Sequence, residues 1–120
     1  MFKVITISGS TRFKEEFQDV ASYLEKKGCI VLTTHVFTHA DQLPITQEEI
    51  EMYEKMYQQQ IDMSSEVVVI NKNGYIGVST QKEIDYTTNQ GKKVTYLYGD
   101  KDKNSKAKEI TDLYNPYINY

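Results

Sequence analysis

The chain has 120 residues, with 14 Lys and Arg against 17 Asp and Glu, which gives a formal net charge of −3. This length predicts one domain, residues 1–120, built around a single core. A hydrophobic content of 39% and a charged content of 26% are typical of a folded globular protein and argue against intrinsic disorder. The mild acidity, without clustered Lys and Arg, argues against a nucleic-acid polymer or a membrane surface as partner.

Three further features narrow the class of protein. Cys29 is the only cysteine, so neither a disulfide framework nor a cysteine zinc cluster can form. The first residues read as a strand and predict no signal peptide, because no charged segment is followed by a long apolar stretch. The longest aliphatic run, 67–70, is too short to cross a bilayer. We therefore expect a cytoplasmic location.

The first third of the chain alternates between strand-like and helix-like patterns. Val4–Ile7 predicts a first, buried strand. Residues 10–27 carry apolar side chains at helical spacing, and Gly28 follows in a position typical of a left-handed helix cap. Ile30–Leu32 then predicts a second strand.

The middle of the chain repeats this alternation. Thr46 and Glu49 form a capping-box pattern that opens a long helix with an apolar stripe. Met52 and Met56 flank that stripe and suggest a second apolar face, suited to a partner subunit. Val67–Ile70 predicts the third strand.

The remaining segments complete the pattern. Residues 79–90 predict a third helix, opened by a second capping-box pattern of Thr80 with Glu83 and stopped at Gly91. Residues 93–98 predict a fourth strand, and 107–113 a short last helix.

Strands that alternate with helices require a mostly parallel sheet covered on both faces. We therefore predict an α/β fold, a flavodoxin-like doubly wound parallel sheet of about four to five strands with helices on both faces. If the strand order is 2-1-3-4, a crevice opens at the carboxyl ends of strands 1 and 3. Residues 8–12 and 71–79 then face each other across this crevice.

The segment from Ser8 to Arg12 has the composition of an anion site. It lies between a buried strand and a helix, where free backbone N–H groups and the helix dipole favour negative charge. Gly9 allows close approach of the backbone, Ser10 and Thr11 add hydroxyl groups, and Arg12 offers a planar fork for phosphate. An ordinary strand-to-helix turn with a Ser/Thr cap accounts equally well for the same residues.

Glu83 allows two interpretations. A glutamate at the third position of a capping box satisfies its own helix backbone. The same position lies beside the predicted crevice, where a helix N-terminus lowers the pKa of a carboxylate and keeps it ionised as a nucleophile or cation stabiliser.

Other candidates lie on the neighbouring segments. Asp62, near the end of the long helix, reaches the crevice only if that helix end folds back. His35, His39 and Asp41 follow the second strand, where a loop that covers the pocket is favoured over a metal site, because the segment is predicted to be a loop and the His-x-x-x-His spacing therefore does not place both rings on one helical face. Tyr75 lies between two loop glycines, where a nucleobase could stack on it.

Taken together, three stretches resemble the nucleoside 2-deoxyribosyltransferase-like superfamily. They are Ser8-Gly9-Ser10-Thr11-Arg12-Phe13, then Ile61-Asp62 leading into Glu66-Val67-Val68-Val69-Ile70, and Gly74-Tyr75-Ile76-Gly77-Val78-Ser79-Thr80-x-x-Glu83-Ile84. The resemblance extends from Val4 to about Leu97. It implies a flavodoxin-like sheet and an enzyme that breaks the bond between a base and its sugar, either an N-glycosidase or a deoxyribosyltransferase.

The resemblance also implies roles for single residues. Glu83 matches the glutamate that attacks the anomeric carbon, and Asp62 resembles an acid used near the sugar. Gly9-Ser10-x-Arg12 is similar to a phosphate-holding loop, which favours a nucleoside 5′-monophosphate over a bare nucleoside. Gly77 stands where transferases commonly have an acid and Ser79 where a glycine is often found, so hydrolysis is favoured over transfer. The substrate-binding residues implied by pattern and resemblance are Ser8, Gly9, Ser10, Thr11, Arg12, His35, Gly74, Tyr75, Gly77 and Ser79.

The chemistry of this bond fits a carboxylate. Cleavage builds positive charge on the sugar, which a fixed carboxylate stabilises and then traps covalently. The leaving base needs a proton or a hydrogen bond, which Asp62, Asp41 or a histidine could supply. This route requires no metal and no organic cofactor.

Partners and rival functions follow from the same residues. Family members are often oligomers, and an apolar tail of Tyr117, Ile118 and Tyr120 predicts a homodimer or a larger homo-oligomer. The main rival is a non-catalytic module that binds or sequesters nucleotides in the same crevice. A phosphoribohydrolase of the lysine-decarboxylase-like family is disfavoured, because its glycine-rich phosphate motif is absent.

Overall fold

The computed structural model describes residues 1–98, and the expected last helix at 107–113 and the apolar tail lie outside these residues. The described part is an α/β fold with four parallel strands in the order β2-β1-β3-β4, consistent with the flavodoxin-like prediction. Its elements are β1 (Val4–Gly9), α1 (Lys14–Lys26), β2 (Ile30–Leu32), α2 (Gln47–Met63), β3 (Glu66–Ile70), the single 3-10 turn η1 (Lys72–Gly74), α3 (Val78–Asn89) and β4 (Lys93–Tyr96).

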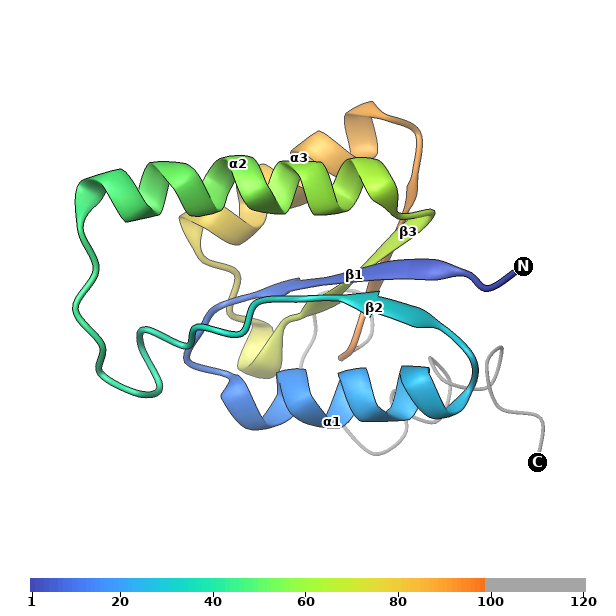
Figure 1. Cartoon of the computed structure of the whole chain (residues 1–120), viewed down its shortest axis with the longest axis horizontal. Helices are drawn as coiled ribbons and strands as arrows, with labels where there is room; N and C mark the ends of the chain where they lie inside the picture. Colours follow the sequence, from blue (N-terminus) through green and yellow to red (C-terminus); the bar gives the residue numbers. More distant parts are fainter. Residues whose placement is uncertain (99–120) are drawn as a thin grey trace.

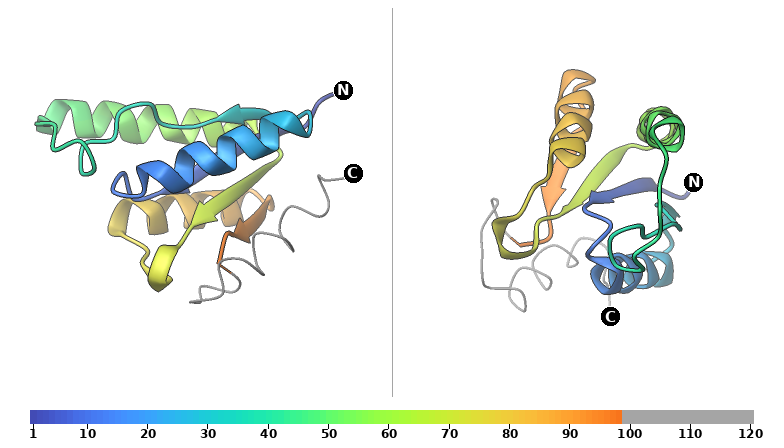
Figure 2. Two further views of the ribbon diagram at one scale, coloured as in Figure 1. Left: turned by 90° about the horizontal axis from the view of Figure 1, so that it is seen from below. Right: turned by 90° about the vertical axis from the view of Figure 1, so that its left-hand side faces the viewer.

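The helices cover both faces of the sheet. Helix α1 packs on one face, and α2 and α3 lie side by side on the other (Figure 1). Seen from the end of the molecule, the sheet twists between these two layers (Figure 2). The order β2-β1-β3-β4 means that the chain reverses its direction of travel between β1 and β3, which is where ligands of doubly wound sheets bind.

Each face of the sheet has its own apolar core, because successive strand residues point to opposite faces. Val68 and Ile70 of β3 belong to the core under α1, and Val67 and Val69 to the core under α2 and α3. In β1 the odd positions Ile5 and Ile7 are buried under α1. The even positions of β1 therefore face α2 and α3. Ser8 is one of these even positions.

Several element ends differ from the prediction. Strand β1 continues to Gly9, because Ser8 and Gly9 pair with Val69 and Ile70 of β3. Helix α1 starts at Lys14 rather than at residue 10, because residues 10–13 form a turn closed by the Phe13 N–H to the Ser10 carbonyl at 3.0 Å. The predicted left-handed stop is confirmed: Gly28 has φ +88° after α1, and its N–H reaches the Glu25 carbonyl at 3.0 Å.

The two predicted capping boxes have different outcomes. The box before α2 is confirmed, with the Glu49 N–H donating to Thr46 Oγ1 at 3.1 Å and the Thr46 N–H donating to Glu49 Oε1 at 2.9 Å. The prediction of a capping box formed by Thr80 and Glu83 is wrong. Helix α3 begins at Val78, two residues before Thr80, with Gly77 as N-cap and no capping side chain, so Thr80 is already inside the helix and buried. Glu83 is thereby free of a capping role.

Candidate active site

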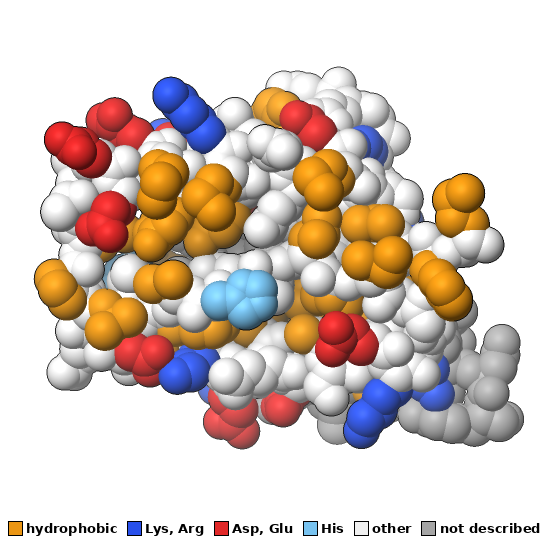
Figure 3. All heavy atoms as spheres, viewed as in Figure 1, with side chains coloured by type: hydrophobic (Ala, Val, Ile, Leu, Met, Phe, Trp, Pro, Cys, Tyr) orange, Lys and Arg blue, Asp and Glu red, His pale blue; other side chains and the backbone are white. Residues whose placement is uncertain are grey.

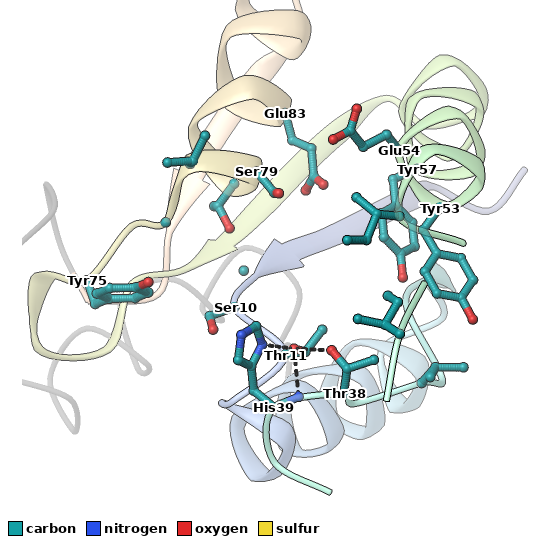
Figure 4. Close-up of a pocket in the computed structure, with 17 residues that line it drawn as sticks. Ser10, Thr11, Thr38, His39, Tyr53, Glu54, Tyr57, Tyr75, Ser79 and Glu83 are labelled. Carbon is teal, nitrogen blue, oxygen red and sulfur yellow. Dashed lines mark hydrogen bonds between the residues drawn. The ribbon is translucent and has the colours of Figure 1, made fainter. Parts of the chain in front are cut away.

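A cavity of about 360 Å³ opens at the carboxyl ends of the strands, at the reversal point between β1 and β3. Its walls come from four segments: the end of β1 with the turn after it, the segment between β2 and α2, residues 50–57 of α2, and the start of α3 with the loop before it (Figure 4). Its size falls within the range of small-molecule binding pockets. The predicted crevice therefore exists, and α2 contributes a wall to it.

Glu83 points into this cavity from the second turn of α3 (Figure 4). The Ser8 hydroxyl donates a hydrogen bond to Glu83 Oε1. Ser8 can do so because its position in β1 faces α3 and not α1. A residue of β1 thus orients a carboxylate of α3 that lies 75 positions later in the sequence.

The pKa of Glu83 is raised from 4.5 to about 7. Burial of the carboxylate is the main cause, the Ser8 hydrogen bond opposes it, and the negative charge of Glu54 adds to it. The expectation that the helix N-terminus would lower this pKa is wrong. Glu83 lies beyond the first turn, where the helix dipole has little effect, and burial dominates.

Glu54 is a second carboxylate at the cavity, which sequence reasoning missed. It extends from α2 toward Glu83 (Figure 4). Its side chain is 44% exposed, and its Oε1 lies 4.0 Å from Lys82 Nζ at the surface. The signal in the sequence was its spacing, four residues after Ile50 and three before Tyr57, which places it on the side of α2 that lines the cavity.

The α2 side of the cavity is apolar and aromatic. Ile50, Tyr53 and Tyr57 form it together with Val36 and Ile45 from the segment before the helix. The rings of Tyr53 and Tyr57 lie 6.1 Å apart with an angle of 25° between their planes. The Tyr57 hydroxyl donates to Thr34 Oγ1 at 2.8 Å, which fixes that ring. Ile50, Tyr53 and Tyr57 belong to the apolar stripe predicted for this helix, and the structure shows that they line a cavity.

The opposite side of the cavity is polar and rich in backbone. Ser10 and Thr11 follow β1, and Ser79 and Thr80 lie in the first turn of α3. The N–H groups of the first turn of a helix have no partner within the helix and favour a negative group. This end of the cavity is therefore suited to a polar or anionic part of a ligand.

Arg12 does not line the cavity. Its guanidinium carbon lies 4.3 Å from the centre of the Tyr75 ring, and its Nε donates to Ser10 Oγ at 3.0 Å. Tyr75 lines the cavity and also contacts the Phe13 ring edge-on, with 6.1 Å between centroids. Arg12 and Phe13 thus join the turn after β1 to the loop before α3.

The segment after β2 presents one of its two histidines to the cavity. His39 lines it, with its Nδ1 2.5 Å from Thr11 Oγ1. His35 is exposed and does not line it. Asp41 is paired with Lys14 Nζ at 2.9 Å. Within residues 1–98, no group of three or more His, Cys, Asp or Glu side chains could hold a metal ion.

Asp62 lies at the other edge of the sheet. Its Oδ1 accepts hydrogen bonds from the Tyr86 hydroxyl at 2.8 Å and from Gln90 Nε2 at 2.7 Å, which lower the pKa of its carboxyl. Helix α2 runs antiparallel to the strands, so its last turn ends where the strands begin. The helix end does not fold back toward the cavity.

The structure therefore divides the predicted site residues into two groups. Ser8 contacts Glu83, and the predicted residues that line the cavity are Gly9, Ser10, Thr11, Tyr75, Gly77, Ser79 and Glu83. Four predicted residues do not line it: Arg12, His35, Gly74 and Asp62. The residues that line the cavity come from the end of β1 with the turn after it and from the loop before α3 with the first two turns of α3, which the topology places at the same end of the sheet.

Two findings bear on the class of protein. Among the helices of residues 1–98, none has the length and apolar content needed to span a membrane. A comparison of the chain with protein-family models finds no match, and a comparison with curated proteins finds none either.

Proposed function

We propose that this protein cleaves the N-glycosidic bond of a nucleoside or nucleoside 5′-monophosphate, with Glu83 as the nucleophile. The observation that carries the proposal is the position of the Glu83 carboxylate. It is held by Ser8 at a cavity that has an aromatic wall on one side and a polar wall on the other. A nucleotide has the same division, with a flat apolar base at one end and a polar sugar phosphate at the other.

The two walls suggest how the substrate lies. The base packs against Tyr53 and Tyr57, because aromatic rings stack favourably on a flat heterocycle. The sugar phosphate lies toward Ser10 and the first turn of α3, where hydroxyl and backbone N–H groups favour an anion. The anomeric carbon then falls between the two walls, in front of Glu83.

The chemistry then follows from the charge that develops. Departure of the base leaves positive charge on the sugar, and the Glu83 carboxylate stabilises it and forms an ester with the anomeric carbon. Water then cleaves this ester and frees the sugar. Gly77 and Ser79 favour water over a second base as acceptor, as expected from the resemblance. The route requires no metal or organic cofactor.

The test is a search for free base. The full 120-residue chain is incubated with the common nucleosides and their 5′-monophosphates, and the products are separated by chromatography. We expect base release from at least one of them. In Glu83→Gln the rate of base release should fall by a factor on the order of a thousand or more. Glutamine keeps the size of the side chain and can still contact Ser8.

The control measures binding and folding. Glu83→Gln should retain its circular dichroism spectrum and bind the reactive nucleotide with comparable affinity. Binding by the wild-type protein without any base release would contradict the proposal, and would leave the non-catalytic nucleotide-binding module as the better account.

A further inference from the structure

The departing base needs a proton, and the structure offers a specific donor. We propose that His39 is the acid–base residue that protonates the leaving base, and that Thr11 is the residue that positions it. This inference rests on the proposed glycosidic cleavage and deepens it.

The other candidates are placed elsewhere. Asp62 lies at the opposite edge of the sheet, bonded to α3. Asp41 is paired with Lys14, and His35 does not line the cavity. His39 is the candidate donor, among those that the sequence leaves open, that lines it.

The imidazole of His39 is held on one side. Its Nδ1 lies 2.5 Å from Thr11 Oγ1, and its backbone N–H donates to the same oxygen at 3.3 Å. Thr11 Oγ1 lies 3.2 Å from Thr38 Oγ1 and can donate its own hydrogen there. Thr11 is thus able to accept from Nδ1–H, which leaves Nε2 as the ring nitrogen available to a ligand.

The segment that carries His39 is itself anchored. Phe37 is buried in the core, with its ring 5.5 Å from that of Phe17. The Lys14–Asp41 ion pair at 2.9 Å joins the other end of the segment to α1. Both anchors flank His39, so its ring is presented to the cavity from a fixed backbone.

His39 and Glu83 approach the cavity from different sides. Glu83 extends from α3, and His39 rises from the segment after β2 at the opposite rim (Figure 4). A nucleophile attacks the anomeric carbon from the face opposite to the leaving group. For a base packed against Tyr53 and Tyr57, the side turned away from Glu83 is the side that faces the rim carrying His39.

Two proton transfers complete the cycle. As a Glu83 oxygen bonds to the anomeric carbon, the carbon–nitrogen bond breaks and its electron pair goes to the base nitrogen. The Nε2–H proton of imidazolium then goes to the base, leaving His39 neutral. In the second step Nε2 takes a proton from water, whose oxygen bonds to the anomeric carbon while the ester bond breaks and its electron pair returns to Glu83. The sum is nucleotide plus water giving free base plus sugar phosphate.

The experiment compares leaving groups. The full-length chain and its His39→Asn variant are assayed on the best nucleotide and on the 4-nitrophenyl glycoside of the same sugar phosphate, whose phenolate leaves without a proton. We expect His39→Asn to lose on the order of a hundredfold or more in kcat on the nucleotide and less than about fivefold on the nitrophenyl substrate. His35→Asn, from the same segment, is the matched control and should lose neither activity.

Thr11 and added imidazole give independent measurements. Thr11→Val removes the hydroxyl and keeps the branched shape, so it should reduce cleavage of the nucleotide more than cleavage of the nitrophenyl substrate. The loss should be smaller than that in His39→Asn. Thr11→Ser, which keeps a hydroxyl, should retain nucleotide cleavage. His39→Ala should regain nucleotide cleavage when free imidazole is added, a result that does not depend on the nitrophenyl substrate.

The outcomes separate the two proposals. No base release by the wild-type protein overturns the proposed function itself. Base release that is lost in Glu83→Gln but unchanged in His39→Asn overturns the role of His39 alone. Equal losses on both substrates, without rescue of His39→Ala by imidazole, would show that His39 binds or supports the site and transfers no proton.

Discussion

At the scale of single residues, the environment of Glu83 decides what the cavity can do. Burial raises its pKa to about 7, and Glu54 adds to the effect through its negative charge. Near neutral pH a large share of Glu83 is therefore protonated in the free protein. A nucleophile must be ionised, so the same burial that places Glu83 in front of a substrate also makes its reactivity depend on pH.

We predict that cleavage of the nitrophenyl substrate, which needs no proton donor, increases as the pH rises through about 7, because Glu83 ionises there. Glu54→Gln removes the neighbouring negative charge and should move the midpoint of this rise to lower pH. The measurement is the pH profile of kcat/KM for both proteins, with Glu51→Gln, on the exposed side of α2, as control. A midpoint that stays in place or moves upward in Glu54→Gln would contradict the coupling of the two carboxylates.

The same pKa predicts how stability depends on pH. The pKa of Glu83 is about 7 in the folded protein, above its ordinary value of 4.5, so the folded state favours the protonated carboxyl. This contribution to stability is fully present below pH 4.5 and is lost as the pH rises to about 7. The unfolding free energy of the wild-type protein should therefore fall relative to that of Glu83→Gln by up to about 3 kcal/mol across this interval. Urea unfolding of both proteins at several pH values measures it, and a constant difference would rule out the raised pKa.

At the scale of elements, the end of β1 holds the site together. The alternation of side chains along this strand sends Ile7 into the core under α1 and Ser8 toward Glu83. Gly9 follows, at the point where β1 pairs with Ile70 of β3. The strand end thus supplies a buried anchor, a hydrogen bond to the carboxylate and a cavity wall within three consecutive residues.

Gly9→Ala should destabilise the fold. A Cβ there would lie 3.0 Å from the Ile70 Cβ and 3.1 Å from the Ile70 carbonyl oxygen, so β1 and β3 would have to move apart. We expect a loss of about 1–3 kcal/mol in the free energy of unfolding.

Gly77→Ala is the matched control for this change. The three atoms nearest to its Cβ would all belong to the Tyr75 side chain, the closest being the hydroxyl oxygen at 3.2 Å, and that side chain can shift. Thermal and urea unfolding of both variants measure the difference. An equal or larger loss in Gly77→Ala would mean that close packing of β1 against β3 does not explain the glycine at position 9.

At the scale of the whole molecule, apolar side chains remain on the surface beside the cavity. They gather along α2 and the segment before it (Figure 3), where Met52 and Met56 are 48% and 47% exposed. Large exposed apolar side chains that lie together on one face favour association with another protein surface. The homodimer or larger homo-oligomer proposed from the sequence would bury this face.

We predict that the protein sediments as a homo-oligomer at micromolar concentration. The double variant Met52→Glu/Met56→Glu should shift it toward the monomer, because two charges on this face resist burial. Sedimentation velocity measures both proteins, with Lys26→Glu on α1, the helix on the opposite face of the sheet, as control. A wild-type protein that sediments strictly as a monomer would contradict the prediction.

The sequence by itself determined the class of fold. Alternating strand and helix patterns, glycines after α1 and α3, and short aliphatic runs led to the parallel sheet, because these signals are local and depend on periods of two and 3.6 residues, whereas the order 2-1-3-4 was only assumed until the structure showed it. The local pattern placed Glu83 near the start of a helix at the carboxyl edge but left a helix cap and a catalytic role both open, and the catalytic role came from the family resemblance.

Only the tertiary structure decided which side chains share the cavity. Ser8 meets Glu83 because of a register between strands, Glu54 reaches it because α2 packs beside α3, and Asp62 is excluded because α2 runs antiparallel to the strands. Burial then reversed the expected direction of the Glu83 pKa. Register, packing and desolvation are properties of distant segments brought together, so no local pattern carries them.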